Sequence, residues 1–194
     1  MELLGEITAD RPLLVVAVKE EAQFLGAGFP VLLTGIGKVN AATALATVLA
    51  RGPRPSGIVN LGTAGALRPG LRGTHVIGSV IQHDLDSAML AALTGEMYGA
   101  PLDLADEGGP VLATGDSFIA DDAARDRLAA RAALVDMEGY AVAAAAQQAG
   151  VPVRLVKHVS DEAGDGAART WQESVAECGR ELAVWAAEHL TVGS

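Results

Sequence analysis

The chain has 194 residues, half of them hydrophobic, and its formal net charge is −10 at pH 7. A chain of this length and apolar content is expected to fold as a single domain over residues 1–194, and its composition disfavours disorder. The acidic balance opposes attraction to phosphate backbones and to anionic lipid, so neither nucleic acid nor a membrane is expected as a partner.

Short apolar runs alternate along the chain with longer stretches of helical period. The runs predict strands at Leu13–Val18, Val31–Thr34, Gly57–Leu61, Thr74–Ile81, Val111–Thr114, Ala133–Asp136 and Val153–Val159. The periodic stretches predict helices at Lys38–Arg51, Asp121–Arg131, Met137–Ala149 and Arg169–Leu190. This alternation indicates an α/β layered domain with buried, partly parallel strands, and in such domains ligands bind at the carboxyl ends of the strands.

The first expected strand leads into AVKEEAQF, which begins at Ala17. Two acidic side chains at the start of a helix, Glu20 and Glu21, interact favourably with the helix dipole, which accounts for them without any function. The other interpretation is that one of them faces a pocket, and the pattern does not decide which.

Two segments rich in small residues follow the next strands. TGIGKVNAA, residues 34–42, stands before a helix, where backbone N–H groups can face an anion or a polar ligand. It fails the dinucleotide fingerprint, which needs a third Gly, and the P-loop, which needs Ser or Thr after the Lys, so a tight turn with Lys38 in solvent is the alternative. NLGTAGAL, residues 60–67, is interpreted as a second turn, in which Gly lets the backbone approach a ligand and Thr63 adds a hydroxyl.

Later segments carry further candidates. QHDLD, residues 82–86, resembles part of a metal-ligand cluster, but no other His or carboxylate stands at a recognised spacing, so no metal is expected. TGDSFI presents Phe118 at the end of a strand, where the ring either stacks on a flat ligand or belongs to the core. Residues 96–109 are acidic and rich in Gly, and they are expected to form a loop.

LVDMEGYAVAAAAQQAG joins a strand end to an Ala-rich helix and places two carboxylates, Asp136 and Glu138, at the junction. KHVSDEAGDG follows the most apolar strand with the pair Ser160 and Asp161. Asp161 is compatible with a ligand contact, with a helix cap and with an Asx turn.

The last helix carries large residues at intervals of four and three, which places them on one face. That face is interpreted as core, with a subunit interface as the alternative. It consists of Trp171, Val175, Cys178, Leu182, Trp185 and His189.

The compartment is inferred from what the chain lacks. Cys178 has no second cysteine to pair with, so it is expected to act as a small buried hydrophobe in a reducing environment. The amino terminus is acidic where a signal peptide is positive, and no apolar run approaches the roughly 20 residues that span a bilayer. A soluble, cytoplasmic protein is therefore expected.

Seven motifs, in this order, resemble the nucleoside phosphorylase and nucleosidase family, in particular its methylthioadenosine/S-adenosylhomocysteine nucleosidases. They are AVKEEAQFL, GIGKVNAA, VNLGTAGAL, HDLD, TGDSFI, VDMEGYAVA and VKHVSDEAG, and they extend from Ala17 to Gly164. The resemblance implies a three-layer αβα sandwich around a mixed, mostly parallel sheet. It also implies a small-molecule nucleoside and water as binding partners, and no cofactor.

The resemblance assigns roles to individual residues. Glu21 is similar to the carboxylate that activates water, and Asp161 to the one that protonates the leaving purine. Glu138 is similar to the carboxylate that binds the ribose hydroxyls. The other implied substrate contacts are Thr63, Ala64 and Gly65 near the sugar and the water, Met137 under the sugar, Phe118 stacked on the base, Ile119 beside its edge, and Ser160.

These residue types suit the reaction independently of the family. Cleaving an N-ribosidic bond develops positive charge on the sugar and negative charge on the base, so it needs a carboxylate near the ribose and an acid near the purine. Glu138 and Asp161 can supply them, and two ribose hydroxyls would satisfy the oxygens of a buried Glu138. Asp136 is interpreted as structural.

Hydrolysis is favoured over phosphorolysis. Relatives similar to the hexameric purine phosphorylases place an Arg just before the GS or GT turn, whereas Asn60 stands here, so no cation is expected at that point. The Ser-Asp pair suits adenine, as in methylthioadenosine or S-adenosylhomocysteine. Futalosine hydrolases, which carry Ser-Asn there, are an alternative because they share MEG and a GD followed by Arg and Trp, as in GDGAARTW.

The chain departs from the family in two places. Too few residues separate KEEAQF from TGIGK for the family's extra hairpin, and HDLD from TGDSF for its long helix. Both regions shape the family's 5′ pocket and dimer contact, so the 5′ substituent stays open, while a homo-oligomer, with a dimer favoured, is expected. A catalytically inactive nucleoside-binding protein is a further alternative, against which the joint presence of Glu21, Glu138 and Asp161 argues.

Overall fold

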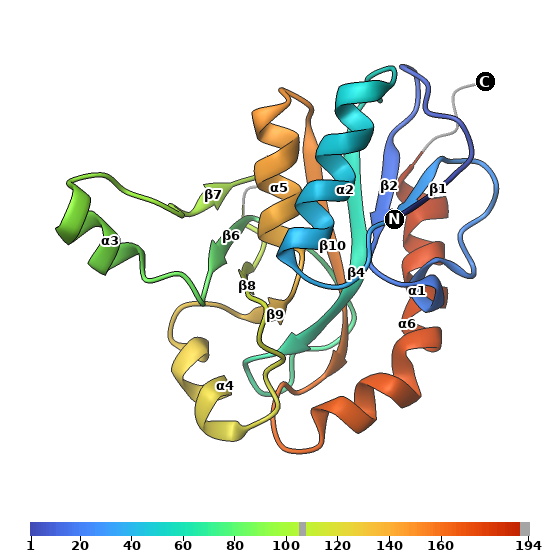
Figure 1. Ribbon diagram of the computed structural model, residues 1–194. Coiled ribbons are helices and arrows are strands. Elements are labelled where there is room, and N and C mark those ends of the chain that lie inside the picture. Colours follow the sequence, from blue (N-terminus) through green and yellow to red (C-terminus); the bar gives the residue numbers. More distant parts are fainter. Residues whose placement is uncertain (105–107, 191–194) are drawn as a thin grey trace.

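The computed structural model of the protein describes residues 1–104 and 108–190. Over these residues ten strands form one sheet, and six helices accompany it (Figure 1). The sheet is mixed and mostly parallel, which confirms the predicted fold class.

The strands are β1 (Glu2–Leu4), β2 (Leu13–Val16), β3 (Val31–Leu33), β4 (Ile58–Ala66), β5 (Thr74–Val76), β6 (Ser79–Gln82), β7 (Leu102–Asp103), β8 (Val111–Thr114), β9 (Leu134–Asp136) and β10 (Val153–Asp161). Their order in the sheet is β1-β3-β2-β4-β9-β8-β6-β7, with β10 beside β4 and β5 beside β10. The two nine-residue strands, β4 and β10, run parallel to each other and form the spine of the sheet.

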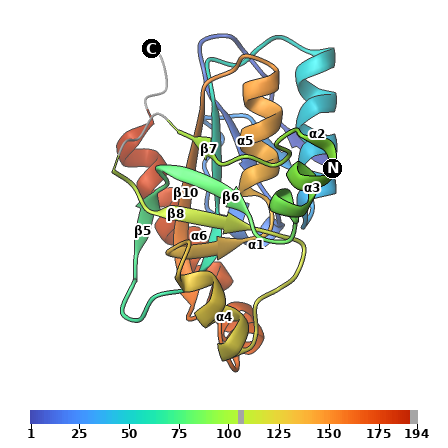
Figure 2. The same ribbon diagram turned by 90° about the vertical axis from the view of Figure 1, so that its left-hand side faces the viewer.

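The helices are α1 (Lys19–Ala22), α2 (Lys38–Arg51), α3 (Ser87–Thr94), α4 (Asp122–Ala129), α5 (Gly139–Gln148) and α6 (Ala167–His189). On one face of the sheet α2 packs against α5, and α6 lies on the other face, so the domain has three layers (Figure 2). None of the helices in the described part of the chain is long and apolar enough to cross a membrane.

Helices on both faces explain why the central strands are continuous apolar runs. On β2, Leu13 and Val15 belong to the apolar cluster under α2 and α5, whereas Leu14 and Val16 belong to the cluster under α6. Full burial of one such side chain stabilises the fold by about 1.5–3 kcal/mol. The strand therefore needs apolar residues at successive positions, which is the pattern that reveals it in the sequence.

The neighbour of β4 changes halfway along its length. β2 pairs with β4 as far as Asn60, and β9 pairs with it from Gly65 onward. Among the described strands, residues 61–64 of β4 thus have a ladder only with β10. On the far side of this gap, β6 and β8 cross the view at a steep angle to β10 (Figure 2).

Two sequence predictions are wrong at this point of the fold. Residues 60–67 are predicted to form a turn, but β4 continues through them to Ala66, because its small residues pack between buried neighbours. The single strand predicted over Thr74–Ile81 is divided into β5 and β6. The division falls next to Gly78, where a Cβ atom would stand 2.6 Å from the carbonyl oxygen of Gly109, so this backbone contact requires a residue without a side chain.

Short elements escape prediction. β1, α3 and β7 are missing from the expected elements, and none of them contains a buried residue, so none shows a periodic apolar face. β7 lies inside the predicted loop of residues 96–109, part of which falls outside the described residues. The predicted alternation of strands and helices is confirmed, and so is the predicted helix at Lys38–Arg51.

Gly179 sets the distance between α6 and α1. A Cβ atom at this position would lie 2.7 Å from the carbonyl oxygen of Glu20 and 3.3 Å from that of Glu21. Two backbones therefore touch where α6 crosses the short α1, and this contact fixes the height of α1 over the sheet.

We expect Gly179→Ala to lower the free energy of unfolding by about 1–3 kcal/mol, because the added methyl group forces the two backbones apart. Urea unfolding followed by circular dichroism measures this. The matched control is Gly26→Ala, since a Cβ atom at Gly26 meets nothing within 4 Å. Equal stability of the two variants would show that the close approach is not a constraint.

Candidate active site

A cavity of about 230 Å³ opens at the gap beside β4. All ten residues that the sequence nominates for a site line this cavity. They are Glu21, Thr63, Ala64, Gly65, Phe118, Ile119, Met137, Glu138, Ser160 and Asp161. They lie in β4 and β10 or just beyond the carboxyl ends of β2, β8 and β9, so the convergence follows from the fold and not from closeness in the sequence.

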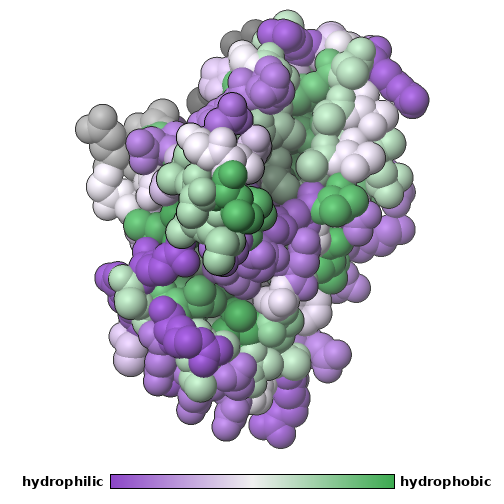
Figure 3. All heavy atoms as spheres, turned by 60° about the vertical axis from the view of Figure 1, so that its left-hand side comes forward, coloured by the Kyte–Doolittle hydropathy of each residue, from purple (hydrophilic) through white to green (hydrophobic). Residues whose placement is uncertain are grey.

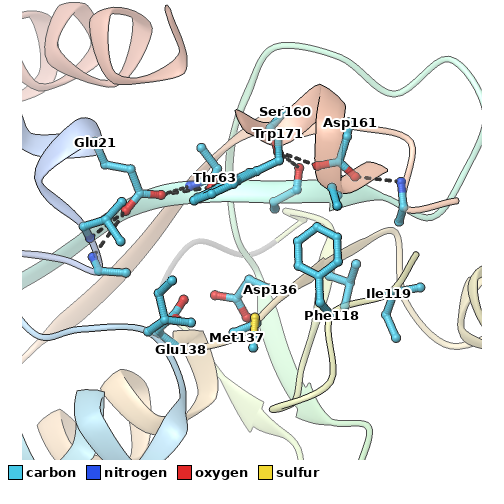
Figure 4. Close-up of a pocket in the computed structure, with 18 of the residues that line it drawn as sticks. Glu21, Thr63, Phe118, Ile119, Asp136, Met137, Glu138, Ser160, Asp161 and Trp171 are labelled. Atoms are coloured by element: carbon cyan, nitrogen blue, oxygen red, sulfur yellow. Dashed lines mark hydrogen bonds between the residues drawn. The ribbon is translucent and has the colours of Figure 1, made fainter. Parts of the chain in front are cut away.

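The side chains divide between two sides of the cavity (Figure 4). Glu21 and Asp161 lie at opposite ends of one wall, with Thr63 between them. Glu138 and Met137 lie across from this wall. The ring of Phe118 stands at the Asp161 end; it is 44% exposed, so the interpretation of this residue as core is wrong.

Glu21 is only 3% exposed and is held by the edge of β4. Its Oε1 accepts hydrogen bonds from the backbone N–H of Thr63 at 2.7 Å and from the Thr63 hydroxyl at 2.9 Å. Its Oε2 accepts longer bonds from the N–H groups of Ala17 and Val18, at 3.3 and 3.4 Å. Glu21 thus replaces the missing strand partner of β4. Glu20 is exposed, so Glu21 is the residue of the pair that faces the cavity.

Asp161 reaches the cavity through a β-bulge. The pairing of β10 with β4 shifts between Val159 and Asp161, which leaves Ser160 as an extra residue. In a regular strand, neighbouring residues point to opposite faces, but the bulge lets both Ser160 and Asp161 line the cavity. The Ser160 hydroxyl donates to Oδ2 of Asp161 at 2.7 Å. Gly65 leaves room for this carboxylate, because a Cβ atom there would lie 3.1 Å from Oδ1.

The Asx turn considered for Asp161 is also present. Its Oδ1 accepts a hydrogen bond from the N–H of Ala163 at 2.9 Å. Ala163 has a φ of 47°, an uncommon conformation for a residue with a side chain, which costs on the order of 1 kcal/mol or more. Asp161 therefore stabilises a strained turn and borders the cavity at the same time.

Glu138 is buried at the start of α5 and touches the start of α2. Its Oε1 accepts a hydrogen bond from the N–H of Gly37 at 2.7 Å, and Gly37 has a φ of 97° that favours glycine. The N–H of the Gly-rich turn thus faces a polar acceptor, as expected, but the acceptor is a side chain of the protein and not a ligand. Burial, followed by the negative charge of Asp136, raises the pKa of Glu138 to about 8, against the opposing effect of Lys157.

A buried ion pair lies behind Glu138. The Nζ atom of Lys157 stands 2.8 Å from Oδ2 of Asp136, and both side chains are 1% exposed. Thr114 and the N–H of Gly139 also donate to this carboxylate. Burial alone would lower the pKa of Lys157, but the charges of Asp136 and Glu138 outweigh it and raise the pKa. A buried ion pair is tolerated only when its hydrogen bonds are complete, which fits the structural interpretation of Asp136.

Three loops around the cavity are tied by Lys38. Its Nζ donates to Oδ1 of Asp84 at 2.6 Å and to Oε1 of Gln82 at 3.0 Å, so the alternative interpretation, with Lys38 in solvent, is wrong. Its backbone N–H donates to Asp116, and the N–H of Asp116 donates back to Asp84. This links the Gly-rich turn, the segment after β6 and the segment that carries Phe118.

The carboxylate at the centre of the candidate metal motif is therefore occupied by internal contacts. Asp84 accepts from Lys38 and Asp116, as described above. Burial lowers the pKa of His83, whose ring packs directly over Gly115. Within residues 1–104 and 108–190, no group of three or more His, Cys, Asp or Glu side chains is placed to hold a metal ion.

The sequence misses two residues of this region. Lys157 lies in β10 among other polar residues, such as Arg154 and His158, so nothing in the sequence marks it as the buried one. Trp171 is predicted to belong to the core stripe of the last helix, but it lines the cavity and is half-buried. His189, at the other end of the stripe, is exposed and stacks on Trp185. The middle of the stripe, including Cys178, is buried as predicted.

Comparison with known proteins identifies the family of this chain. Residues 25–191 match the family model described as the phosphorylase superfamily. A 5′-methylthioadenosine/S-adenosylhomocysteine nucleosidase of Anoxybacillus flavithermus is 33% identical over 163 residues, covering 72% of this chain and 70% of the relative.

Two solved structures from Helicobacter pylori resemble the fold. A D198N mutant nucleosidase with 5′-methylthioadenosine in its active site has a TM-score of 0.80 and 21% identity, covering 93% of this chain and 98% of that one. A futalosine hydrolase mutant has a TM-score of 0.78 and 19% identity, covering 91% and 96%. At these identities the likeness concerns the fold alone.

The raised pKa of Glu138 predicts a pH-dependent stability. The carboxyl keeps its proton up to a pKa of about 8 in the folded protein, against an ordinary value of 4.5. Between these values the folded state binds more protons than the unfolded state, so stability falls as the pH rises. We expect wild type to lose stability relative to Glu138→Gln from pH 4.5 to 8, by at most about 1.4 kcal/mol per pH unit. Urea unfolding of both proteins at a series of pH values measures the difference in their free energies of unfolding. If the two free energies change with pH in parallel, Glu138 does not keep its proton in the folded state.

Proposed function

Because the chain belongs to the phosphorylase superfamily, we propose that it is a purine nucleosidase, an N-ribosyl hydrolase acting on an adenine nucleoside such as methylthioadenosine or S-adenosylhomocysteine. The observation that carries this proposal is the convergence of Glu21, Glu138 and Asp161 on one cavity. Relatives that bear the name of such nucleosidases, at 31–33% identity, support the same class.

The two sides of the cavity suit the two parts of a nucleoside. Glu138 and Met137 would contact the ribose, and Phe118 would stack on the base beside Ile119. Glu21, between Thr63 and the sugar, would take a proton from the attacking water. This transfer accompanies the departure of the base, during which positive charge develops on the sugar beside Glu21 and negative charge develops on the base.

Asp161 would deliver the proton that the departing base needs. Its neighbour Ser160 holds one carboxyl oxygen, and the N–H of Ala163 holds the other, so the group is fixed in direction. A fixed acid of this kind typically contributes about 10²–10⁴-fold to the rate. The same carboxyl can accept a hydrogen bond from a 6-amino group, which favours adenine; Thr63, Ala64 and Gly65 would border the sugar.

Hydrolysis is favoured because the cavity offers no cation. Among the described residues that line it there is no Lys or Arg. Asn60 is buried and donates to the carbonyl oxygen of Val15 at 2.9 Å. A buried cation that the sequence prediction overlooks, Lys157, has its Nζ 3.1 Å from the position of a Cβ on Gly62, but it is already paired with Asp136. A phosphate anion would meet Glu21 without compensation, whereas water is neutral.

A homo-oligomer, with a dimer favoured, is part of the proposal. Hydrophobic side chains gather in several groups on the face that carries α3 (Figure 3). Contiguous exposed apolar surface is typical of protein interfaces. The exposed large hydrophobic residues of α3 and of the segments near it are Ile36, Val39, Met89, Leu93, Met97 and Tyr98.

We expect free adenine and a free ribose derivative from methylthioadenosine or S-adenosylhomocysteine, at a rate independent of phosphate. Chromatographic product analysis on these two substrates, adenosine, inosine and futalosine, with and without phosphate, measures this. Strict phosphate dependence would identify a phosphorylase, and release from futalosine alone would identify the futalosine-type alternative. Tight binding without release from any substrate would favour the inactive nucleoside-binding alternative.

Substitution of the two proposed catalytic carboxylates should separate chemistry from folding. We expect Glu21→Gln and Asp161→Asn each to reduce kcat by roughly 10²–10⁴-fold, because each removes a proton-transfer group. The matched controls are Glu20→Gln and Asp165→Asn, at exposed neighbours of the same residue type. Thermal unfolding checks that all four variants fold, and an unchanged kcat for either cavity variant would remove that residue from the mechanism.

A further inference from the structure

Trp171 is distant in the sequence from Glu21, the proposed water-activating residue, but is connected to it by hydrogen bonds. It lies in α6, and its indole Nε1 donates a hydrogen bond to the hydroxyl oxygen of Thr63 at 2.9 Å. The same hydroxyl donates to Oε1 of Glu21 at 2.9 Å. Figure 4 shows the indole ring along the wall between Thr63 and Ser160. A chain of hydrogen bonds thus runs from Trp171 through Thr63 to Glu21.

The donors and acceptors along this series of hydrogen bonds are fixed by the chemistry of the groups. An indole N–H can only donate, whereas a hydroxyl has one proton to donate and can accept. Once the Thr63 oxygen accepts from Trp171, its own proton is free to point to Glu21. The backbone N–H of Thr63 donates to the same Oε1 at 2.7 Å. Two short bonds therefore occupy Oε1.

The other oxygen of Glu21 is bound more weakly. Oε2 accepts bonds of 3.3 and 3.4 Å from Ala17 and Val18, near the long limit for such contacts. Oε2 is consequently the oxygen better able to take a proton. Rotation of the carboxylate would exchange the two oxygens, and the ordered Thr63 hydroxyl opposes that rotation.

We propose that Trp171 is a positioning residue which, by ordering the Thr63 hydroxyl, holds Glu21 with Oε1 bound and Oε2 directed to the attacking water. This proposal rests on the nucleosidase function proposed above. The N–H of Trp171 acts through Thr63, while its ring is a separate contribution to the cavity wall.

Two substitutions divide these contributions. Trp171→Phe keeps an aromatic ring and removes the N–H, so we expect kcat to fall about three- to tenfold with KM unchanged, as for the loss of one ordinary hydrogen bond. Trp171→Ala also removes the ring, so KM should rise as well. The matched control is Trp185→Phe, the same change in the same helix but in the core, and it should leave both constants unaltered. An unchanged kcat for Trp171→Phe would overturn the proposal.

A double-mutant cycle tests whether Trp171 acts through Thr63. In a Thr63→Val background there is no hydroxyl to order, so adding Trp171→Phe should change kcat no further. In a Thr63→Ser background, which keeps a hydroxyl, the effect of Trp171→Phe should return. Equal effects of Trp171→Phe in the wild-type and Thr63→Val backgrounds would show an independent role and overturn the proposal.

One readout does not depend on turnover. The chain has two Trp residues, so an indole-¹⁵N-labelled sample gives two N–H signals, which Trp171→Phe assigns. We expect Thr63→Val to move the Trp171 signal and to leave that of Trp185 in place. A wild-type protein that releases no base overturns the proposed function, and this NMR result then decides separately whether the hydrogen-bond chain exists. A Trp171 signal unmoved by Thr63→Val would refute the chain whatever the activity.

Discussion

The structure depends on an interruption in the sheet, where the pairing of β4 with β2 has ended and its pairing with β9 has not yet begun. Buried backbone donors need partners, and at Thr63 the partner is a carboxylate instead of a strand. The same interruption makes room for a cavity in the middle of a domain that is otherwise packed on both faces. Site and scaffold therefore share one cause: the stretch of β4 that has no neighbouring strand on one side is the stretch that binds Glu21.

The charges around the cavity are arranged so that each carboxylate has a different environment. Glu21 is surrounded by N–H and O–H donors, Asp136 is neutralised by Lys157, and burial favours the protonated form of Glu138. Asp161 is held by a neighbouring hydroxyl and a turn. Carboxylates that differ in this way can serve different roles in one reaction, which identical environments would not allow.

The sequence predicts the layers and the central strands through apolar periodicity, and it predicts ten of the residues that line the cavity through motifs with a fixed order. The roles of those ten residues stay predictions. The bulge at Ser160 could not be foreseen, since it arises from pairing with a strand about a hundred positions away. Lys157 is one of several polar residues in its strand, and Trp171 fits the helical period of the core, so local patterns conceal both. Elements without a buried face, such as α3, leave no periodic signal.

The position of Glu138 connects the cavity to the packing of two helices. The residue stands at the start of α5 and is bound by the amide that precedes α2, and these two helices lie against each other over the sheet. Small changes in the side chains packed between these helices would alter the spacing of the helix ends, and therefore the position of the Glu138 carboxylate. Natural substitutions between α2 and α5 can thus shift Glu138 and change the site, although none of the substituted residues lines the cavity.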